Sequence, residues 1–374
     1  MSDYTLHVVG QAYLPSRREP AGCAYSTLIA SFCRMMAREG VKVVHYGCEG
    51  SEVGGAEHVT VLSEEERAGF FGKIDAQALY RPRFRIDDPA WIAHNGRASW
   101  LIGKAAYDGD IVGYSAGSAE APIAKHLGRR VFNTEIIIGH RGAFAEYRVY
   151  PSYAWAHVYA GREDDPDGKY YDTVIPHWFD ADMFPSPESV VEEHDDYLLF
   201  MARVIPRKGL LIAVEVARAL NCRLLVCGAG GSSPRPGALI EAGKNLYEHP
   251  GLEYLGFVDH RRRVELFSRA RAFLAPTIYH EPFGLTAIEA QACGCPVVAT
   301  DWGAFTETVE PGVSGFRART LKQFVDGVKL CEALSRRQIA ERAHRKYESA
   351  VVAPMYVSYF ETLQTLRGKG WYTL

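Results

Sequence analysis

The amino-acid sequence predicts an α/β protein with two doubly wound domains, each a parallel sheet with helices on both faces. Three observations support this fold class. The chain has 374 residues, which is more than one hydrophobic core usually supports. Strand-like and helix-like segments alternate from residue 5 onward, an order that favours parallel strands joined by helices. A second alternating series begins at residue 197, after a polar, turn-rich stretch at 160–172.

The first half opens with a β-rich segment at 5–10, followed by a loop and a helix at 25–40 that Gly40 ends. The apolar residues that recur at helical spacing in this helix are Leu28, Ile29, Phe32, Met35 and Met36. Further strands of this half are expected at 41–47, 109–115 and 129–138. The boundary to the second half is expected near 182–195, which gives domains at about 1–185 and 190–350.

The second half repeats the alternation, starting from the run 197–209. Its further strands are expected at 223–231, 252–257, 272–276 and 296–301, and its helices at 210–220, 261–270 and 285–293. In a doubly wound sheet, a ligand binds at the carboxyl ends of the strands, so the loops that follow these strands are the candidate binding residues.

Composition excludes several classes of function. The chain is 47% hydrophobic and 23% charged, which argues against disorder, and its net charge of −3 gives no footprint for nucleic acid. The sequence has no Cys-x-x-Cys pair of the kind that would indicate a zinc site. Its eight cysteines are typical of a reducing compartment. No signal peptide and no stretch of about twenty apolar residues is visible, so a cytoplasmic protein without a membrane span is expected.

The stretch EPFGLTAIEAQACGCPVVAT at 281–300 is the most informative part of the chain. Glu281 precedes a Pro-Phe-Gly corner, and Glu289 lies eight positions later in the predicted helix. The start of that helix presents free N–H groups and partial positive charge, which bind phosphate. The backbone donors expected there run from Phe283 through Gly284 and Leu285 to Thr286. A carboxylate on either side fits a ribose, a phosphate and a polyhydroxylated group, in other words a sugar nucleotide.

Other strand-end loops of this half agree with that interpretation. Arg203, Arg207 and Lys208 follow the first strand and are suited to a diphosphate. The glycines of VCGAGG, at 226–231, allow close approach of a ligand to the backbone. The loop at 255–260 offers backbone groups to a base.

Together, RVIPRKG, VIPHWFDADMF and HEPFGLTAIEAQACGCPVVATDWGAFTETV resemble retaining glycosyltransferases of family 4, which have the GT-B fold. The resemblance covers about 174–316 and implies two Rossmann-like domains facing a cleft, with a C-terminal helix (353–374) packing back on the first domain. It implies that Glu281 contacts the donor sugar, Glu289 the ribose, and Arg203 and Lys208 the diphosphate. The residues implied to hold the distal phosphate or line the base are Phe283, Gly284, Leu285, Thr286, Gly256, Phe257 and Val258.

The implied reaction moves a hexose from a UDP- or GDP-linked donor to a hydroxyl acceptor with retention, without a metal or other cofactor. The departing phosphate oxygen takes the proton of the incoming hydroxyl. In the first half, Gly22 matches the family's glycine loop near the diphosphate. The family's histidine after a mid-domain strand has no counterpart in register, where Glu135 or Ile136 stands, and His140 follows later. Tyr153, Trp155 and His157 are candidates either for acceptor contacts or for the core face of a helix.

Several alternatives stay open from the sequence. GYSAG at 113–117 matches the nucleophile elbow of an α/β-hydrolase, with Ser115 as nucleophile. The Asp-x-Asp pairs at 108–110 and 180–182 match the metal site of transferases with the other common fold. A sugar-nucleotide epimerase, a phosphorylase or a binding module would use the same donor site. The arginine-rich stretch at 260–272 is interpreted as a solvated helical face rather than a partner site.

Overall fold

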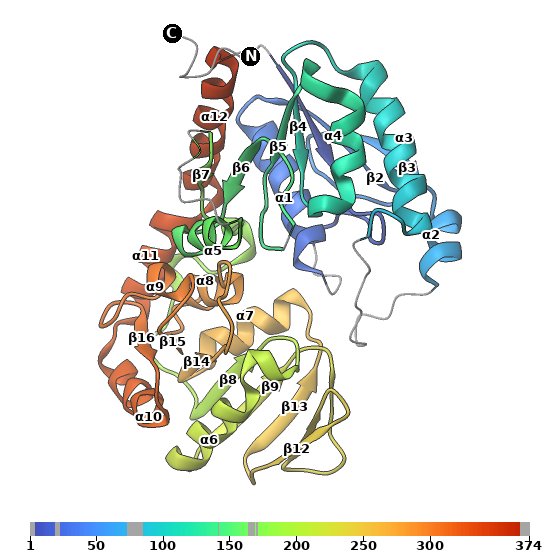
Figure 1. Cartoon of the computed structure of the whole chain (residues 1–374). Coiled ribbons are helices and arrows are strands. Elements are labelled where there is room, and N and C mark those ends of the chain that lie inside the picture. The colour runs from blue at the N-terminus through green and yellow to red at the C-terminus, as the bar shows by residue number, and fades with distance from the viewer. Residues whose placement is uncertain are drawn as a thin grey trace. The chain divides into compact units, whose positions relative to one another are not determined.

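The computed structural model describes residues 4–18, 23–72, 85–140, 142–163, 169 and 171–366. Within them, the chain forms two compact units. Unit 1 holds the residues up to Pro176 and those from Ala350, and unit 2 holds His177–Ser349. Each unit is built around one parallel sheet (Figure 1), which confirms the predicted α/β class.

Unit 1 contains a seven-stranded parallel sheet in the order β3-β2-β1-β4-β5-β6-β7. The strands are β1 (Thr5–Val9), β2 (Lys42–Cys48), β3 (Glu57–Leu62), β4 (Ile111–Tyr114), β5 (Phe132–Glu135), β6 (Tyr147–Tyr150) and β7 (Thr173–Val174). The helices are α1 (Ala24–Arg38), α2 (Glu64–Phe71), α3 (Pro89–Ala105), α4 (Ala121–Leu127), α5 (Tyr153–Glu163) and α12 (Ser349–Leu366). Strands are added from β1 to β3 on one side of β1 and from β4 to β7 on the other. The boundary between β1 and β4 is therefore the switch point where doubly wound folds place ligands.

The last helix, α12, is part of unit 1, as the predicted return of the C-terminus requires. The ring of Tyr356 lies 5.0 Å from that of Phe32 on α1, in an edge-on arrangement. The hydroxyl of Tyr356 donates a hydrogen bond of 2.7 Å to the carbonyl of Ile136, which follows β5. Phe360 also contacts Phe32. The helix therefore completes the core of unit 1, although it is separated in sequence from the rest of that unit.

Unit 2 contains a six-stranded parallel sheet in the order β13-β9-β8-β14-β15-β16. These strands are β8 (Tyr197–Met201), β9 (Arg223–Cys227), β13 (Leu252–Gly256), β14 (Ala272–Ala275), β15 (Val297–Thr300) and β16 (Gly315–Ala318). The helices are α6 (Leu210–Leu220), α7 (His260–Arg269), α8 (Leu285–Ala292), α9 (Phe305–Thr308), α10 (Leu321–Leu330) and α11 (Arg336–Tyr347).

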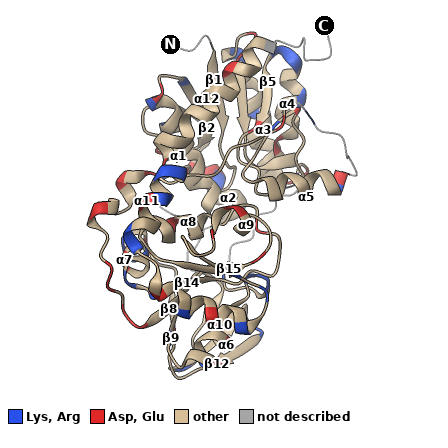
Figure 2. Cartoon of the chain, turned by 90° about the vertical axis from the view of Figure 1, so that its left-hand side faces the viewer, with Lys and Arg blue, Asp and Glu red and all other residues tan. Residues whose placement is uncertain are grey.

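The two faces of this sheet carry separate cores because side chains alternate along buried strands. On β8, Leu198 and Phe200 face the core that α6 and α10 complete. Tyr197 and Leu199 face the opposite core, which α7 and α8 complete. Figure 2 shows acidic and basic residues interspersed along both units, as expected for a net charge of −3.

The connection from β9 to β13 differs from a doubly wound pattern because it contains strands instead of a helix. A small antiparallel sheet is formed by β10 (Gly231–Ser232), β11 (Ala238–Glu241) and β12 (Asn245–Glu248). The N–H of Ala242 at its hairpin tip donates to the carbonyl of Gly230, a bond of 2.8 Å. The hairpin thereby fixes the glycine-rich turn that ends β9.

No helix among the described residues combines the length and the apolar character needed to cross a bilayer.

Candidate functional site

The site is built around the start of α8, at the carboxyl edge of the sheet in unit 2. Gly284 is the N-cap residue, with φ 82° in the left-handed region and no side-chain cap. A Cβ on Gly284 would come within 2.6 Å of the Phe305 ring, so only glycine fits this corner. The first N–H groups of a helix have no partner within the helix and carry partial positive charge. Residues 283–286, predicted to bind an anion, lie at this helix start.

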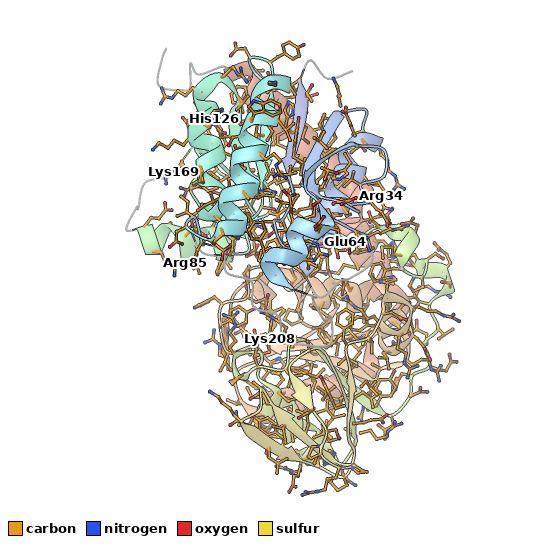
Figure 3. The ribbon with its side chains drawn as sticks, turned by 90° about the vertical axis from the view of Figure 1, so that its right-hand side faces the viewer. Arg34, Glu64, Arg85, His126, Lys169 and Lys208 are labelled. Atoms are coloured by element: carbon orange, nitrogen blue, oxygen red, sulfur yellow. The ribbon has the colours of Figure 1, made fainter. Side chains whose placement is uncertain are left out.

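Three side chains close a hydrogen-bonded triangle beside this helix start: Lys208, Tyr279 and Glu281. The ammonium of Lys208 donates to Oε2 of Glu281 and to the hydroxyl of Tyr279, both at 2.8 Å. The Tyr279 hydroxyl donates to the same Oε2 at 2.6 Å. The side chains of Lys208 and Glu281 are only 16% and 13% exposed. The triangle thus holds a cation and an anion in fixed positions, partly screened from water (Figure 3 labels Lys208).

The backbone makes this triangle possible by bringing three turns together. The N–H of Ile278 donates to the carbonyl of Arg207 at 2.9 Å, which joins the turn after β8 to the turn after β14. The N–H of Ala304 donates to the carbonyl of Glu281 at 3.0 Å, which adds the turn after β15. Gly303 permits this approach, since a Cβ there would lie 2.7 Å from the Glu281 nitrogen. The three turns meet because β8, β14 and β15 are neighbours in the sheet, although β8 is far from the other two in the sequence.

Two further cations lie near Tyr279. The guanidinium of Arg207 is 4.9 Å from the centre of the Tyr279 ring, and both Arg207 and Arg203 are exposed. Burial and the Glu281 carboxylate raise the pKa of the Tyr279 phenol well above its usual value, although Arg207 and Arg203 oppose the shift. The phenol therefore stays protonated and acts as a hydrogen-bond donor to Glu281 at physiological pH.

Glu289, the predicted ribose ligand, lies in α8 and pairs with Arg263 of α7. The two side chains are 13% and 18% exposed. This pairing corrects the interpretation of 260–272 as a wholly solvated face, because one of its arginines points to the candidate site. Other arginines of that stretch pair with exposed carboxylates: Arg262 with Glu265, Arg269 with Asp195, and Arg271 with Asp196 and Glu332.

The predicted base-binding residues lie at the end of β13 and directly after it. Gly256 has φ 70° at an irregularity of the β13–β9 pairing, and its carbonyl accepts from the Gly228 N–H at 2.8 Å. Phe257 and Val258 are partly buried, and Val258 packs against the core under α7 and α8. A Cβ on Gly228 would lie 1.9 Å from the Ala202 carbonyl, next to Arg203. The structure thus brings the loops after β8, β9, β13 and β14 to one edge of the sheet.

Sequence reasoning missed Tyr279, Trp302 and Arg263. The indole N–H of Trp302 donates to the carbonyl of Tyr279 at 3.1 Å and supports the triangle from the turn after β15. Tyr279 stands two residues before Glu281, and this proximity is the one signal in the sequence that marks it. Gly22 lies outside the described residues.

The nucleophile-elbow interpretation of Ser115 is not supported by its surroundings. Its hydroxyl accepts from the side-chain amide of Gln11 at 2.9 Å, and the residue is 1% exposed. A nucleophile elbow is a strained turn. Among the described non-glycine residues, only Asn221 and Ala242 have positive φ. Ser115 is thus a buried serine at the end of β4, held by a glutamine rather than by a histidine.

The Asp-x-Asp pairs are structural in their described contacts. Asp110 accepts from the N–H groups of Thr5 and Tyr107 and bonds to His7. Asp180 is buried beside a short 3-10 turn, Ala181–Met183. Across the described part of the chain, no three His, Cys, Asp or Glu side chains are grouped as metal ligands would be.

The candidate acceptor residues of unit 1 separate into core and surface. Trp155 is buried with Ile138, Tyr150 and Tyr159, as the core-face interpretation of α5 expects. Tyr153 is 63% exposed and His157 is also exposed. His140 is partly buried, and its ring lies 6.0 Å from that of Tyr25.

Glu135, one of the two residues expected near the register of the family's histidine, faces the interior. Its Oε2 accepts from the N–H groups of Phe144 and Ala145 at 2.7 and 3.0 Å. Glu120 does the same for the turn after β4, accepting from Ser115 and Ala116 at 2.8 and 2.7 Å. Both side chains are fully buried. They act as clamps for the two loops that follow β4 and β5.

These clamps predict how stability depends on pH. Burial raises the pKa of Glu120 to about 8 and that of Glu135 to about 7. The folded chain therefore keeps protons that the unfolded chain loses near pH 4.5, and stability falls as pH rises from about 5 to 8. Glu120→Gln retains an oxygen for both N–H groups without a charge. We expect urea unfolding at several pH values to give a shallower decline for this variant, by up to about 1.4 kcal/mol per pH unit.

The exposed Glu65 provides the matched control, because Glu65→Gln removes the same charge without a buried contact. Glu65→Gln should keep the pH dependence of the wild-type chain. An equal slope in Glu120→Gln and wild type would show that Glu120 does not carry a retained proton.

Comparison with known proteins was consistent with this geometry. Residues 185–346 match the family model described as glycosyl transferases group 1. The chain is 29% identical over 185 residues to phosphatidyl-myo-inositol mannosyltransferase of Mycobacterium leprae, covering 46% of this chain and 48% of the relative. It is 36% identical over 129 residues to D-inositol 3-phosphate glycosyltransferase of Nocardia farcinica, covering 32% and 28%. The chain therefore spans about half the length of the first of these curated relatives and less than a third of the second.

Solved structures resemble the whole chain. Sucrose-phosphate synthase from Thermosynechococcus elongatus has a TM-score of 0.69 at 15% identity, covering 97% of this chain and 99% of that one. AviGT4, a glycosyltransferase involved in avilamycin A biosynthesis, has a TM-score of 0.63 at 19% identity, covering 97% and 98%. These similarities confirm the predicted GT-B class of fold.

Proposed function

Because the chain belongs to the glycosyl transferases group 1 family, we propose that it is a retaining glycosyltransferase that uses a nucleoside-diphosphate hexose as donor. The observation that carries the proposal is the Lys208–Tyr279–Glu281 triangle beside the start of α8. A fixed cation and a helix start suit a diphosphate, and the adjacent carboxylate suits sugar hydroxyls.

Each predicted residue has a role in this proposal. Residues 283–286 donate N–H groups to the distal phosphate, while Lys208 and Arg203 neutralise the diphosphate. Glu281 accepts hydrogen bonds from the sugar, and Glu289, oriented by Arg263, accepts from the ribose. The remaining binding residues, whose backbone lines the base or approaches the diphosphate, are Gly256, Phe257, Val258 and Gly22.

The reaction transfers the sugar with its anomeric configuration kept. The bond between the anomeric carbon and the phosphate oxygen breaks, and its electron pair goes to that oxygen. The acceptor hydroxyl oxygen forms the new bond on the same face, and its proton goes to the departing phosphate oxygen. Lys208, Arg203 and the helix start stabilise the negative charge that grows on the diphosphate. In other transferases a divalent metal ion stabilises this charge.

The acceptor in this proposal is a compound with a free hydroxyl group, and the proposal names no narrower chemical class for it. Two curated relatives are named for inositol-containing compounds, but the family match falls on residues 185–346, which lie in unit 2 and carry the proposed donor site. We propose that unit 1 recognises the acceptor; near the register of the family's histidine this unit has Glu135 or Ile136.

The proposal is tested with UDP-glucose, UDP-galactose and GDP-mannose, each mixed with the wild-type chain and with Glu281→Gln. A true donor raises the melting temperature of the wild type by mass action, and transfer or slow hydrolysis releases the free nucleotide. In Glu281→Gln we expect the preference for the sugar nucleotide over the free nucleotide to fall about 10-fold or more, because a hydrogen bond to a charged group is lost. Affinity for UDP or GDP should change little.

Glu215→Gln is the matched control, because Glu215 lies on the surface of α6 and pairs only with Arg218 among its described partners. Loss of nucleotide binding alone in Glu281→Gln would reverse the proposed orientation of the donor. A product that mass analysis identifies as an isomer of the donor, or as a sugar phosphate, would replace the transferase proposal by an epimerase or a phosphorylase.

A further inference from the structure

The hydroxyl of Tyr279 lies at the centre of the charged groups of the proposed donor site. A phenol has one proton to donate and two lone pairs to accept with. The distances of 2.6 Å to Glu281 and 2.8 Å to Lys208 assign these roles, because an ammonium only donates and a carboxylate only accepts. Tyr279 therefore donates to the carboxylate and accepts from the ammonium at the same time.

The ring and backbone of Tyr279 are held from three directions. Its carbonyl accepts from the Trp302 indole, and its ring lies 4.9 Å from Arg207 and 5.0 Å from the Lys208 ammonium. The turn that carries it is tied to Arg207 through Ile278. The hydroxyl consequently has a fixed position, which a flexible lysine or glutamate side chain does not have by itself.

We propose that Tyr279 is a positioning residue for glycosyl transfer, in that it holds Glu281 in place when Lys208 turns to the diphosphate of the donor. This inference rests on the proposed function. A diphosphate competes with Glu281 for the donors of Lys208. The Tyr279 hydroxyl keeps Oε2 of Glu281 satisfied during this exchange, so that Oε1 stays oriented toward the hydroxyls of the sugar.

The same geometry links two parts of the donor. Lys208 acts on the leaving group and Glu281 on the transferred sugar, and a single hydroxyl touches both side chains. Displacement by about 1 Å is enough to cost about a hundredfold in rate when reacting groups must be aligned. The contribution of Tyr279 is therefore expected in the catalytic step more than in donor affinity.

The experiment measures kcat and KM for the donor that the wild type uses, by nucleotide release, in Tyr279→Phe. Phenylalanine keeps the ring and its contacts with Arg207, and removes only the hydroxyl. We expect kcat to fall 10- to 100-fold while KM changes less than about 3-fold. Tyr197→Phe is the matched control, because it removes a 2.7 Å hydroxyl bond to the Leu266 carbonyl elsewhere in unit 2 and should keep kcat.

A double-mutant cycle separates positioning from general structural support. In a Glu281→Gln background, Tyr279→Phe should reduce kcat less than 3-fold further, because its partner is already altered. Fully additive losses, or a kcat of Tyr279→Phe equal to that of the wild type, would overturn the role of Tyr279 and leave the transferase proposal intact. A wild-type chain that releases nucleotide from none of the three donors would overturn both.

Discussion

Replacing Lys208 by alanine is expected to lower kcat about 100- to 1,000-fold, because one preorganised donor to a developing anion contributes about 3–4 kcal/mol. Its ammonium lies 2.8 Å from both Glu281 and Tyr279, and its side chain is 16% exposed, so only a short turn brings the charge from Glu281 to the diphosphate. Arg203 and the start of α8 act on the same charge, which is why some activity should persist. Nucleotide release under saturating donor measures the effect.

The control is Lys244→Ala, since Lys244 is an exposed lysine of the same unit. It removes an equal charge from unit 2 and should keep the wild-type rate. Lys208→Ala also leaves Glu281 and Tyr279 with one partner fewer, so its melting temperature must be measured beside its rate. A folded Lys208→Ala chain with near-normal kcat would contradict the assignment of Lys208 to the leaving group.

The residues predicted for the donor side of the site could be proposed from sequence because several of them are close together in the chain. Glu281, the glycine corner and Glu289 lie within nine residues, and local rules for helix starts apply to them directly. The parallel order of strands then predicted that Lys208 would reach the same edge of the sheet. In the structure Lys208 contacts Glu281 across 73 residues of sequence.

Side-chain pairing was harder to foresee than element order. Arg263 was interpreted as part of a solvated face because a helical face of arginines is most often solvated, and three consecutive arginines do not show which one faces α8. Arg262 pairs with Glu265 on its own helix, whereas Arg263 reaches Glu289. The partner is decided by the packing of α7 beside α8, a tertiary contact that helical periodicity does not encode.

At Ser115 the local pattern was predicted correctly, but its chemical interpretation was not supported. The GYSAG motif and its strand-to-helix setting both match the nucleophile elbow, and the local prediction of a strand end is correct. The chemistry depends on long-range partners, and Gln11, 104 residues away, occupies the position of a base. A motif match therefore needs its distant partners before it indicates a reaction.

The strands β10–β12 were missed for a physical reason as well. Segment 231–248 has two prolines and three glycines, which are typical of loops. β11 reads ALIE, which does not alternate polar and apolar residues, and the hairpin turns at Ala242 and Gly243, both with positive φ. Four-residue strands paired in a hairpin are stabilised by their packing on β13 rather than by propensity.

Gly209→Ala is expected to have the second large effect, this time on stability and rate together. Gly209 follows Lys208 with φ 79°, and a Cβ there would lie 1.9 Å from the Pro276 carbonyl. Because the clash is with backbone, no rotamer change relieves it. The turn after β8 must separate from the turn after β14, which breaks the bond between Ile278 and Arg207. We expect a loss of about 3–5 kcal/mol, measured as a melting temperature lowered by about 10 °C.

Gly243→Ala distinguishes this clash from the cost of the left-handed conformation alone. Gly243 has φ 70° in the same unit, and a Cβ there meets nothing within 4 Å. This control should lose only about 1–2 kcal/mol and keep kcat. Gly209→Ala should also lose most activity at temperatures where it is still folded, since Lys208 and Tyr279 are carried by the two turns it separates. If both variants unfold at the same temperature and keep equal kcat, the close approach of the turns after β8 and β14 does not position the triangle.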